Sequence, residues 1–255
     1  MTIVSLYHII DSIFIGHGVG VMAISGLAIT FPLMNLLMAF CTLTSSGAST
    51  VSSIRLGQKD LDGATNVLGN ALTLCIVNSI LVSIISYIFL DNILLFFGAS
   101  QTTLPYARDF MQVILIGTPI SHVMIGLNNI MRATGYPKKA MLTSMVSVAS
   151  NLILAPIFIF YFEWGIGGAA TATVLAQFIA MIWVVHHFMH KDSFVHFTRK
   201  GWKIRLPILG NIFAIGMSPF LMNVCACAIH TSFRFFGFYY HNDLPVGIYQ
   251  KIKPC

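Results

Sequence analysis

The chain has 255 residues, of which 56% are hydrophobic and only 9% are charged, whereas about a quarter of the residues in an ordinary soluble domain are charged. Too few polar side chains are available to cover a water-soluble globule, so the composition indicates a membrane protein. The net charge of +6 lies mostly in short stretches between apolar runs, which is typical of membrane topology, and we expect the lipid bilayer and not nucleic acid as a partner.

Six windows without Asp, Glu, Lys or Arg are long enough to cross a membrane, because about 20 apolar residues span the hydrocarbon core. The windows are 12–54, 63–90, 110–131, 140–162, 164–190 and 206–233. The first window has room for two passes, and the glycines of GHGVG (16–20) mark the turn. We therefore predict helices at about 1–15, 22–50, 64–90, 106–133, 141–162, 166–190 and 207–231. The alternation of a membrane barrel is absent from these runs, so we predict an all-α polytopic membrane helix bundle.

Basic residues follow the second, fourth and sixth predicted helices, as Arg55, Lys138 and Lys191 illustrate. The intervening connections near 16–21, 91–105 and 163–165 contain no Lys or Arg. By the positive-inside rule the basic connections face the cytoplasm. We therefore expect a multi-pass protein of the plasma membrane with its N-terminus inside.

The linker at 191–206 mixes basic and aromatic residues, as a segment in the lipid headgroup region does. It separates a six-helix domain at 1–190 from a second part at 207–255, which starts with a single helix. The first predicted helix is short, and no eighth span follows the seventh. We expect a truncated chain whose C-terminal lobe is missing.

Asp11 lies within the apolar stretch LYHIIDSIFIGH (6–17). A charged side chain at membrane depth costs about 2.5 to 3.5 kcal/mol on insertion scales, so such groups usually face a bundle interior or an aqueous cavity. Removal from water also favours the protonated form of a carboxyl group, which suits a proton-coupled step. We favour this interpretation over a helix cap at the interface, which the short first segment leaves open.

Five ordered segments together resemble one family of transporters. They are LYHIIDSIFIGHGVG (6–20), GLAITFPLMNLLMAF (26–40), IRLGQKD (54–60), NIMRATGYPKKA (129–140) and NLILAPIFIFYFEWGIGGAATATVLAQ (151–177). From about residue 5 to about residue 225, the chain is similar to the multidrug and toxic compound extrusion (MATE) transporters. The resemblance implies about twelve helices in two six-helix lobes, with substrate crossing between the lobes by alternating access driven by a proton or sodium gradient. This chain would then hold the N-terminal lobe and the first helix of the C-terminal lobe.

The resemblance also implies a proton or cation site made by Asp11 on the first helix, Asn151 on the fifth and Thr173 on the sixth. Many relatives carry an Asp four residues after that Asn, one turn along the same face, but here the position is Ala155. One carboxylate with two neutral oxygens is a poor set of ligands for sodium, which prefers several hard oxygen ligands. We therefore favour proton coupling through Asp11, with sodium as the alternative, and we expect no catalytic residue, no metal site and no cofactor.

Transporters of this family typically export bulky, amphipathic and often cationic compounds, so the resemblance implies an amphipathic small-molecule substrate. Phe and Met surfaces that repack around different shapes suit such substrates. The chain has 13 Met and 20 Phe, too many to single out by pattern. We expect Asn35 and Gln177 to be polar residues that face the substrate cavity.

Three other interpretations stay open. HHFMH (186–190) suggests a di-iron membrane enzyme, but such a site needs several His-rich segments, and the other histidines are isolated. A lipid flippase with the same two-lobe plan fits the hydropathy, although the segments around Asp11 and Asn151 and the lack of an Arg cluster for a phosphate disfavour it. The third is a non-functional or partner-dependent fragment, since alternating access needs both lobes.

Overall fold

The computed structural model describes residues 21–189, 195–197 and 205–243, and these residues form helices with no strand among them. In chain order the helices are α2 (Val21–Gly57), α3 (Leu61–Ile88), α4 (Leu90–Phe96), α5 (Leu104–Ala133), α6 (Pro137–Pro156), the π-helix η1 (Ile157–Tyr161), α7 (Gly165–Met189) and α8 (Leu206–Asp243). Six helical segments in this part of the chain are long and apolar enough to cross a membrane. The predicted all-α membrane bundle is confirmed. The helix predicted at 1–15, and Asp11 with it, lies outside the described residues.

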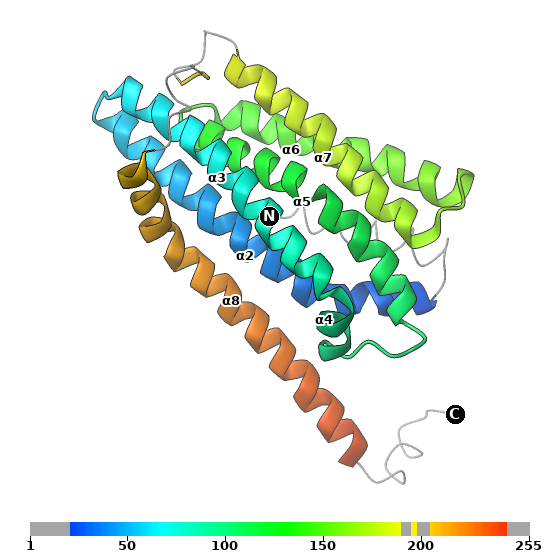
Figure 1. The fold of residues 1–255 in the computed structure, drawn as a ribbon. Helices are drawn as coiled ribbons and strands as arrows, with labels where there is room; N and C mark the ends of the chain where they lie inside the picture. Colours follow the sequence, from blue (N-terminus) through cyan, green and yellow to red (C-terminus); the bar gives the residue numbers. More distant parts are fainter. Residues whose placement is uncertain (1–20, 190–194, 198–204, 244–255) are drawn as a thin grey trace, which may run out of the picture.

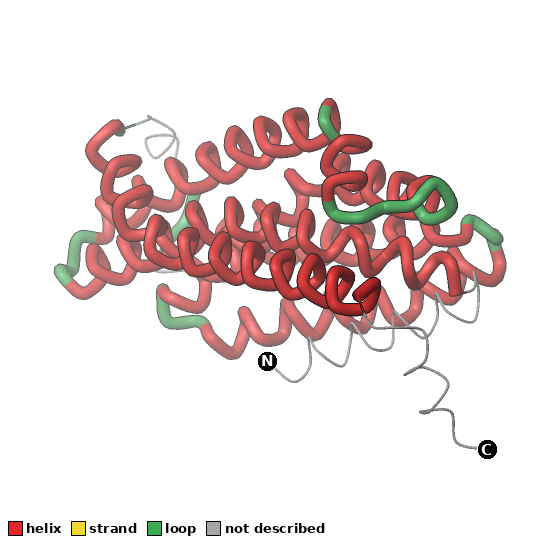
Figure 2. The backbone as a smooth tube through the Cα atoms, turned by 90° about the horizontal axis from the view of Figure 1, so that it is seen from below, coloured by secondary structure: helices red, strands yellow, loops and turns green. Residues whose placement is uncertain are grey.

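The long helices run alongside one another, and the connections lie at the ends of the bundle (Figures 1 and 2). α5 packs against α2 and α3 and also against α6 and α7, so it joins the two halves of the bundle. α8 packs along α2, on the opposite side of the bundle from α6 and α7, and its last turns extend away from the other helices (Figure 1).

Local chemistry explains where several helices begin and end. The Asp60 carboxylate accepts a hydrogen bond from the Gly63 N–H at 2.8 Å and caps the start of α3. Pro105 and Pro137 occupy the first turns of α5 and α6, where a missing N–H costs nothing. α5 ends where Gly135 adopts a φ of 96°, a conformation that favours glycine.

Two features differ from the expected helices. The sequence predicts a connection without a helix at 91–105, but the structure has α4 there. Leu90 and Leu94 of α4 are buried in an apolar cluster. Packing therefore stabilises a helix that is too short to form alone. The single helix expected at 141–162 changes to a π-helix after Pro156, because proline has no N–H to continue the α-helical ladder.

Buried apolar side chains form two clusters at different heights in the bundle. One cluster uses α2 up to Leu37 and α5 up to Leu115, and the other begins at Ala48 on α2 and at Val123 on α5. The helix turns between the two clusters carry buried polar side chains, namely Thr44, Ser45, Ser79, Thr118 and His122. Between the two clusters, the interior of the bundle therefore holds polar side chains among apolar ones such as Cys41 and Leu43.

Candidate functional site

Asn151 and Thr173, two of the residues expected in the cation site, are brought together by α6 and α7. The Asn151 side chain is buried, with 3% of its surface exposed. Its Nδ2 donates a hydrogen bond to Thr173 Oγ1 at 3.0 Å, and Thr173 Oγ1 in turn donates to the Ala169 carbonyl at 3.1 Å. An amide–hydroxyl pair thus links the two helices inside the bundle, where interhelical hydrogen bonds stabilise association.

Ala155 lies one turn beyond Asn151 on α6 and is fully buried. It belongs to the apolar cluster that also contains Ala169 and Ala172 of α7. A methyl group at this position packs well between alanines and adds no oxygen ligand. The amide and hydroxyl oxygens next to it are neutral, so the negative charge of any cation site here has to come from elsewhere.

The backbone changes from an α-helical to a π-helical hydrogen-bonding pattern immediately after Pro156. Pro156 ends α6, and η1 follows with the Phe162 N–H bonded to the Ile157 carbonyl at 3.1 Å. Gly168 of α7 faces this stretch closely, because an added Cβ would lie 2.8 Å from the Phe158 carbonyl oxygen. π-Helical turns are frequent at functional sites, and this one shapes the end of α6 next to Asn151.

The two residues expected to face a substrate cavity lie in different surroundings. Gln177 is half-buried on α7, one turn beyond Thr173, and its Oε1 accepts a hydrogen bond from Ser121 Oγ of α5. Asn35 is exposed on α2 and makes no side-chain hydrogen bond to the described residues. The structure therefore pairs Gln177 with α5 and leaves Asn35 on the surface of the described helices.

Replacing Thr173 by valine tests the α6–α7 hydrogen bond. Thr173→Val keeps the side-chain size but removes the acceptor for Asn151, so we expect the free energy of unfolding to fall by about 1 kcal/mol, measured by equilibrium unfolding in mixed micelles. Thr171→Val is the matched control, because Thr171 Oγ1 donates to the Gly167 carbonyl of its own helix at 2.8 Å. An equal loss in both variants would show that the bond to Asn151 contributes nothing of its own.

Comparison with known proteins identifies relatives over most of the chain. The family model described as MatE matches residues 1–157, more than half of the chain. The chain belongs to the MatE family. The multidrug export protein MepA of Staphylococcus haemolyticus is 32% identical over 219 residues, which cover 86% of this chain and 48% of the relative. MepA of Staphylococcus aureus (strain NCTC 8325 / PS 47) is 30% identical over 219 residues, which cover 86% of this chain and 49% of that relative.

Solved MATE structures share the fold of this MatE chain. An inward-facing conformation of a multidrug resistance MATE family transporter matches with a TM-score of 0.82 and 25% identity over 88% of this chain and 51% of that chain. An outward-facing conformation of a multidrug resistance MATE family transporter also matches with a TM-score of 0.82. The identity is 26%, and the match covers 88% of this chain and 50% of that chain. This chain spans about half the length of the curated relatives it matches, and its matched helices resemble both conformations equally well.

Several polar contacts in the centre of this MatE bundle were missed by sequence reasoning. Asn78 of α3 donates to the Phe40 carbonyl of α2 at 2.9 Å, and Ser83 donates to the Leu115 carbonyl of α5 at 2.5 Å. The Leu115 carbonyl lacks its usual helical partner because residue 119 is proline. The proline was a usable signal in the sequence, but the partner helix was not predictable from it.

His122 of α5 is a further residue of this kind, because sequence reasoning set it aside as an isolated histidine. Its side chain is only 2% exposed and lies near the backbone of Leu37 on α2, and Nδ1 has no hydrogen-bond partner among the described residues. No group of three or more His, Cys, Asp or Glu side chains in the described part of the chain lies close enough to hold a metal ion. His190 of the HHFMH segment lies outside the described residues.

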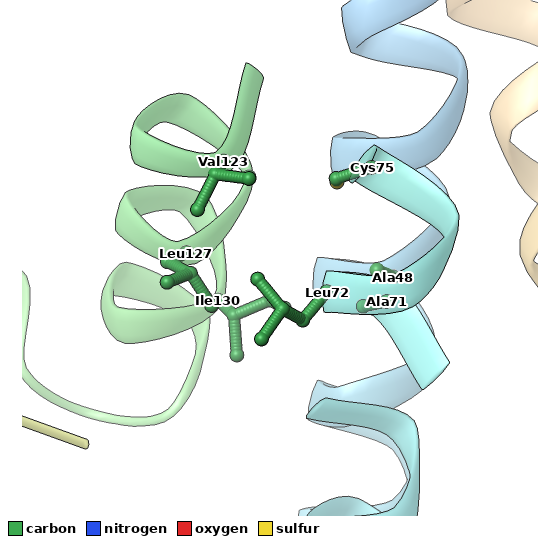
Figure 3. A pocket seen from close by; sticks show the side chains of 8 residues that line it. Ala48, Ala71, Leu72, Cys75, Val123, Leu127 and Ile130 are labelled. Atoms are coloured by element: carbon green, nitrogen blue, oxygen red, sulfur yellow. The ribbon is translucent and has the colours of Figure 1, made fainter. Parts of the chain in front are cut away.

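A crevice where α3 and α5 meet lies at the level of the second apolar cluster (Figure 3). The residues that line it are Ala48, Ala71, Leu72, Cys75, Val123, Gly126, Leu127 and Ile130. The crevice has no room for a water molecule. It is a gap in side-chain packing, and it does not provide a site for a drug.

Proposed function

We propose that this MatE chain forms one lobe of a proton-coupled exporter of amphipathic, often cationic compounds. The observation that carries the proposal is the buried hydrogen bond between Asn151 and Thr173 next to the fully buried Ala155. The relatives are multidrug export proteins, and this supports the substrate class. The distribution of Lys and Arg supports a plasma-membrane orientation with the N-terminus inside.

The number and charge of the oxygen ligands in the proposed site favour proton coupling over sodium coupling. The Asp11 carboxylate would supply the single negative charge. The uncharged polar groups of Asn151 and Thr173 would orient that carboxylate. Ala155 places a methyl group where a second carboxylate would otherwise strengthen sodium binding. A proton needs one basic atom, whereas hard cations take several oxygen ligands. No cofactor has a role in this proposal.

The substrate path is proposed to run along α2, between this lobe and the rest of the transporter. Asn35 is exposed on a membrane-spanning helix, and polar groups at such positions favour an aqueous cavity over lipid. Gln177 is the second residue proposed to line the substrate path. Its Oε1 accepts a hydrogen bond from Ser121, and this bond has to break or be shared before Gln177 can bind a substrate. Bulky apolar side chains near α2 would then accept different drug shapes.

Alternating access is proposed to move residues 1–190 as one lobe, with 191–206 as the linker and 207–255 as the start of the other lobe. The equal similarity to inward-facing and outward-facing structures supports a lobe that keeps its internal arrangement. α8 would contribute the first contact between lobes, because it packs along α2. The Phe40 and Phe220 rings lie 5.2 Å apart, and Asn223 Nδ2 donates to Thr42 Oγ1 at 3.3 Å. The C-terminal lobe of such a transporter is the proposed partner.

The coupling ion is tested by dye efflux from cells that express the protein. A lipophilic cationic dye such as ethidium should leave the cells only while a proton gradient exists, and collapse of that gradient with a protonophore should stop efflux. Replacement of external sodium by potassium should leave the efflux rate unchanged. Efflux that follows the sodium gradient instead would overturn proton coupling, and the absence of any efflux would overturn export by this chain.

A further inference from the structure

Basic and aromatic residues lie where α5 ends, α6 begins and α7 ends. We name this group the α5–α7 basic cluster, and its members are Arg132, Tyr136, Lys138, Lys139 and His187. All five lie within a few residues of the ends of three membrane-spanning segments, which run over Leu104–Ala133, Pro137–Tyr161 and Gly165–Met189. The cluster therefore lies at one boundary of the membrane, where lipid headgroups are.

Lys139 has an exposed side chain that contacts two neighbouring aromatic rings. Its Nζ lies 3.4 Å from His187 Nδ1 and 5.1 Å from the centre of the Tyr136 ring. The Tyr136 and His187 rings lie 4.8 Å apart at 70°, so they support each other as well as the ammonium group. An ammonium group has three N–H donors, so Lys139 has donors to offer besides its contact with His187.

The positive charge of the cluster is not neutralised within the described residues. The ion pairs Arg55–Asp60 and Arg108–Asp91 of the described residues do not include Arg132, Lys138 or Lys139. The sequence from 129 to 162 contains Arg132, Lys138 and Lys139 but no Asp or Glu. A cation with no counter-charge among the described residues attracts an anion from outside them.

Apolar side chains continue the same surface towards the membrane interior. Leu142 lies one turn from Lys139 on α6 and is 44% exposed, and Trp183 lies one turn from His187 on α7 and is 46% exposed. α6 and α7 pack against each other, so these side chains belong to neighbouring helices. The surface is thus cationic at the membrane boundary and apolar beneath it.

We propose that the α5–α7 basic cluster binds the headgroup of an anionic phospholipid, whose acyl chains lie against Leu142 and Trp183. A phospholipid matches the surface in both respects, because its phosphate is anionic at the boundary and its chains are apolar below. Basic pockets between transmembrane helices are known to hold such headgroups, and each Lys or Arg adds to the attraction. The proposal does not depend on the coupling ion or on the drug.

The test measures phospholipid binding to the detergent-purified 255-residue chain by native mass spectrometry. Phosphatidylglycerol and phosphatidylcholine with the same acyl chains are titrated separately. We expect phosphatidylglycerol to be retained and phosphatidylcholine to be lost, and we expect Lys139→Gln to weaken phosphatidylglycerol binding about fivefold. Lys139→Arg keeps the charge and should bind like the wild type.

Lys59→Gln is the matched control, because it removes the same charge from an exposed position in the α2–α3 connection. It should leave phosphatidylglycerol binding unchanged, and glycerol 3-phosphate should not displace the lipid. The proposal is overturned by equal weakening in Lys59→Gln, by unchanged binding in Lys139→Gln, by equal retention of phosphatidylcholine, or by displacement with free glycerol 3-phosphate. If Lys139→Gln loses its helical circular dichroism, His187→Ala replaces it, and unchanged binding in that variant overturns the proposal.

Discussion

Asp11→Asn is expected to reduce gradient-driven dye efflux by about tenfold or more while the protein still reaches the membrane. The amide has the size of the carboxylic acid but cannot take up and release a proton, so a step that depends on protonation of residue 11 stops. General acid–base contributions of this kind are worth about 100-fold or more where they have been measured in enzymes, and a coupled transporter has no bypass for them. Efflux rates are compared at equal amounts of protein in the membrane.

Asp62→Asn is the control for this change. Asp62 is exposed in the first turn of α3, so the substitution removes the same charge outside the proposed site. We expect efflux by Asp62→Asn to stay within about twofold of the wild type, as surface substitutions have small effects. Equal efflux by Asp11→Asn and the wild type would remove Asp11 from the mechanism.

Gly216→Ala is expected to disrupt the packing of α8 on α2 and to abolish export. An added Cβ at Gly216 would lie 1.8 Å from the Leu43 carbonyl oxygen, and one at Gly47 would lie 2.0 Å from the Ile212 carbonyl oxygen. Both obstacles are backbone atoms, so one helix has to shift as a whole. We expect a destabilisation of about 1 to 3 kcal/mol, seen as a lower thermal unfolding midpoint in detergent, and the same for Gly47→Ala.

Gly210→Ala makes the same chemical change on α8, where an added Cβ has no neighbour within 4 Å. It should keep or slightly raise the unfolding midpoint, because alanine favours a helix over glycine by about 1 kcal/mol. Equal midpoints for Gly216→Ala and Gly210→Ala would mean that the close approach of α2 and α8 is not needed for the fold.

The positions of the membrane spans were predictable because charge, glycine and proline mark their ends. α7 occupies Gly165–Met189 where the sequence predicts 166–190, and α5 ends at Ala133 as predicted. α2 continues to Gly57, past the predicted end at about 50, since a helix does not stop where apolar residues stop. α4 was not predictable, because only the burial of Leu90 and Leu94 stabilises it.

The candidate site was less accessible to sequence reasoning than the spans. The proximity of Asn151 and Thr173 was expected from the family resemblance, and no pattern within one helix would have placed them 3.0 Å apart. Ser121 as the partner of Gln177 depends on how α5 and α7 pack, because Gly117 of α5 lets Val174 of α7 come close. Such interhelical registers follow from the shapes of many side chains together.

Proton release on substrate binding distinguishes proton coupling through Asp11 from other mechanisms. Ethidium is added to the purified protein in weakly buffered solution, and the pH change is followed with a soluble indicator. We expect the wild-type protein to release protons as ethidium binds, and Asp11→Asn to bind ethidium without releasing them. Ethidium binding with no release from the wild type, or with equal release from both proteins, would contradict proton-coupled export through Asp11.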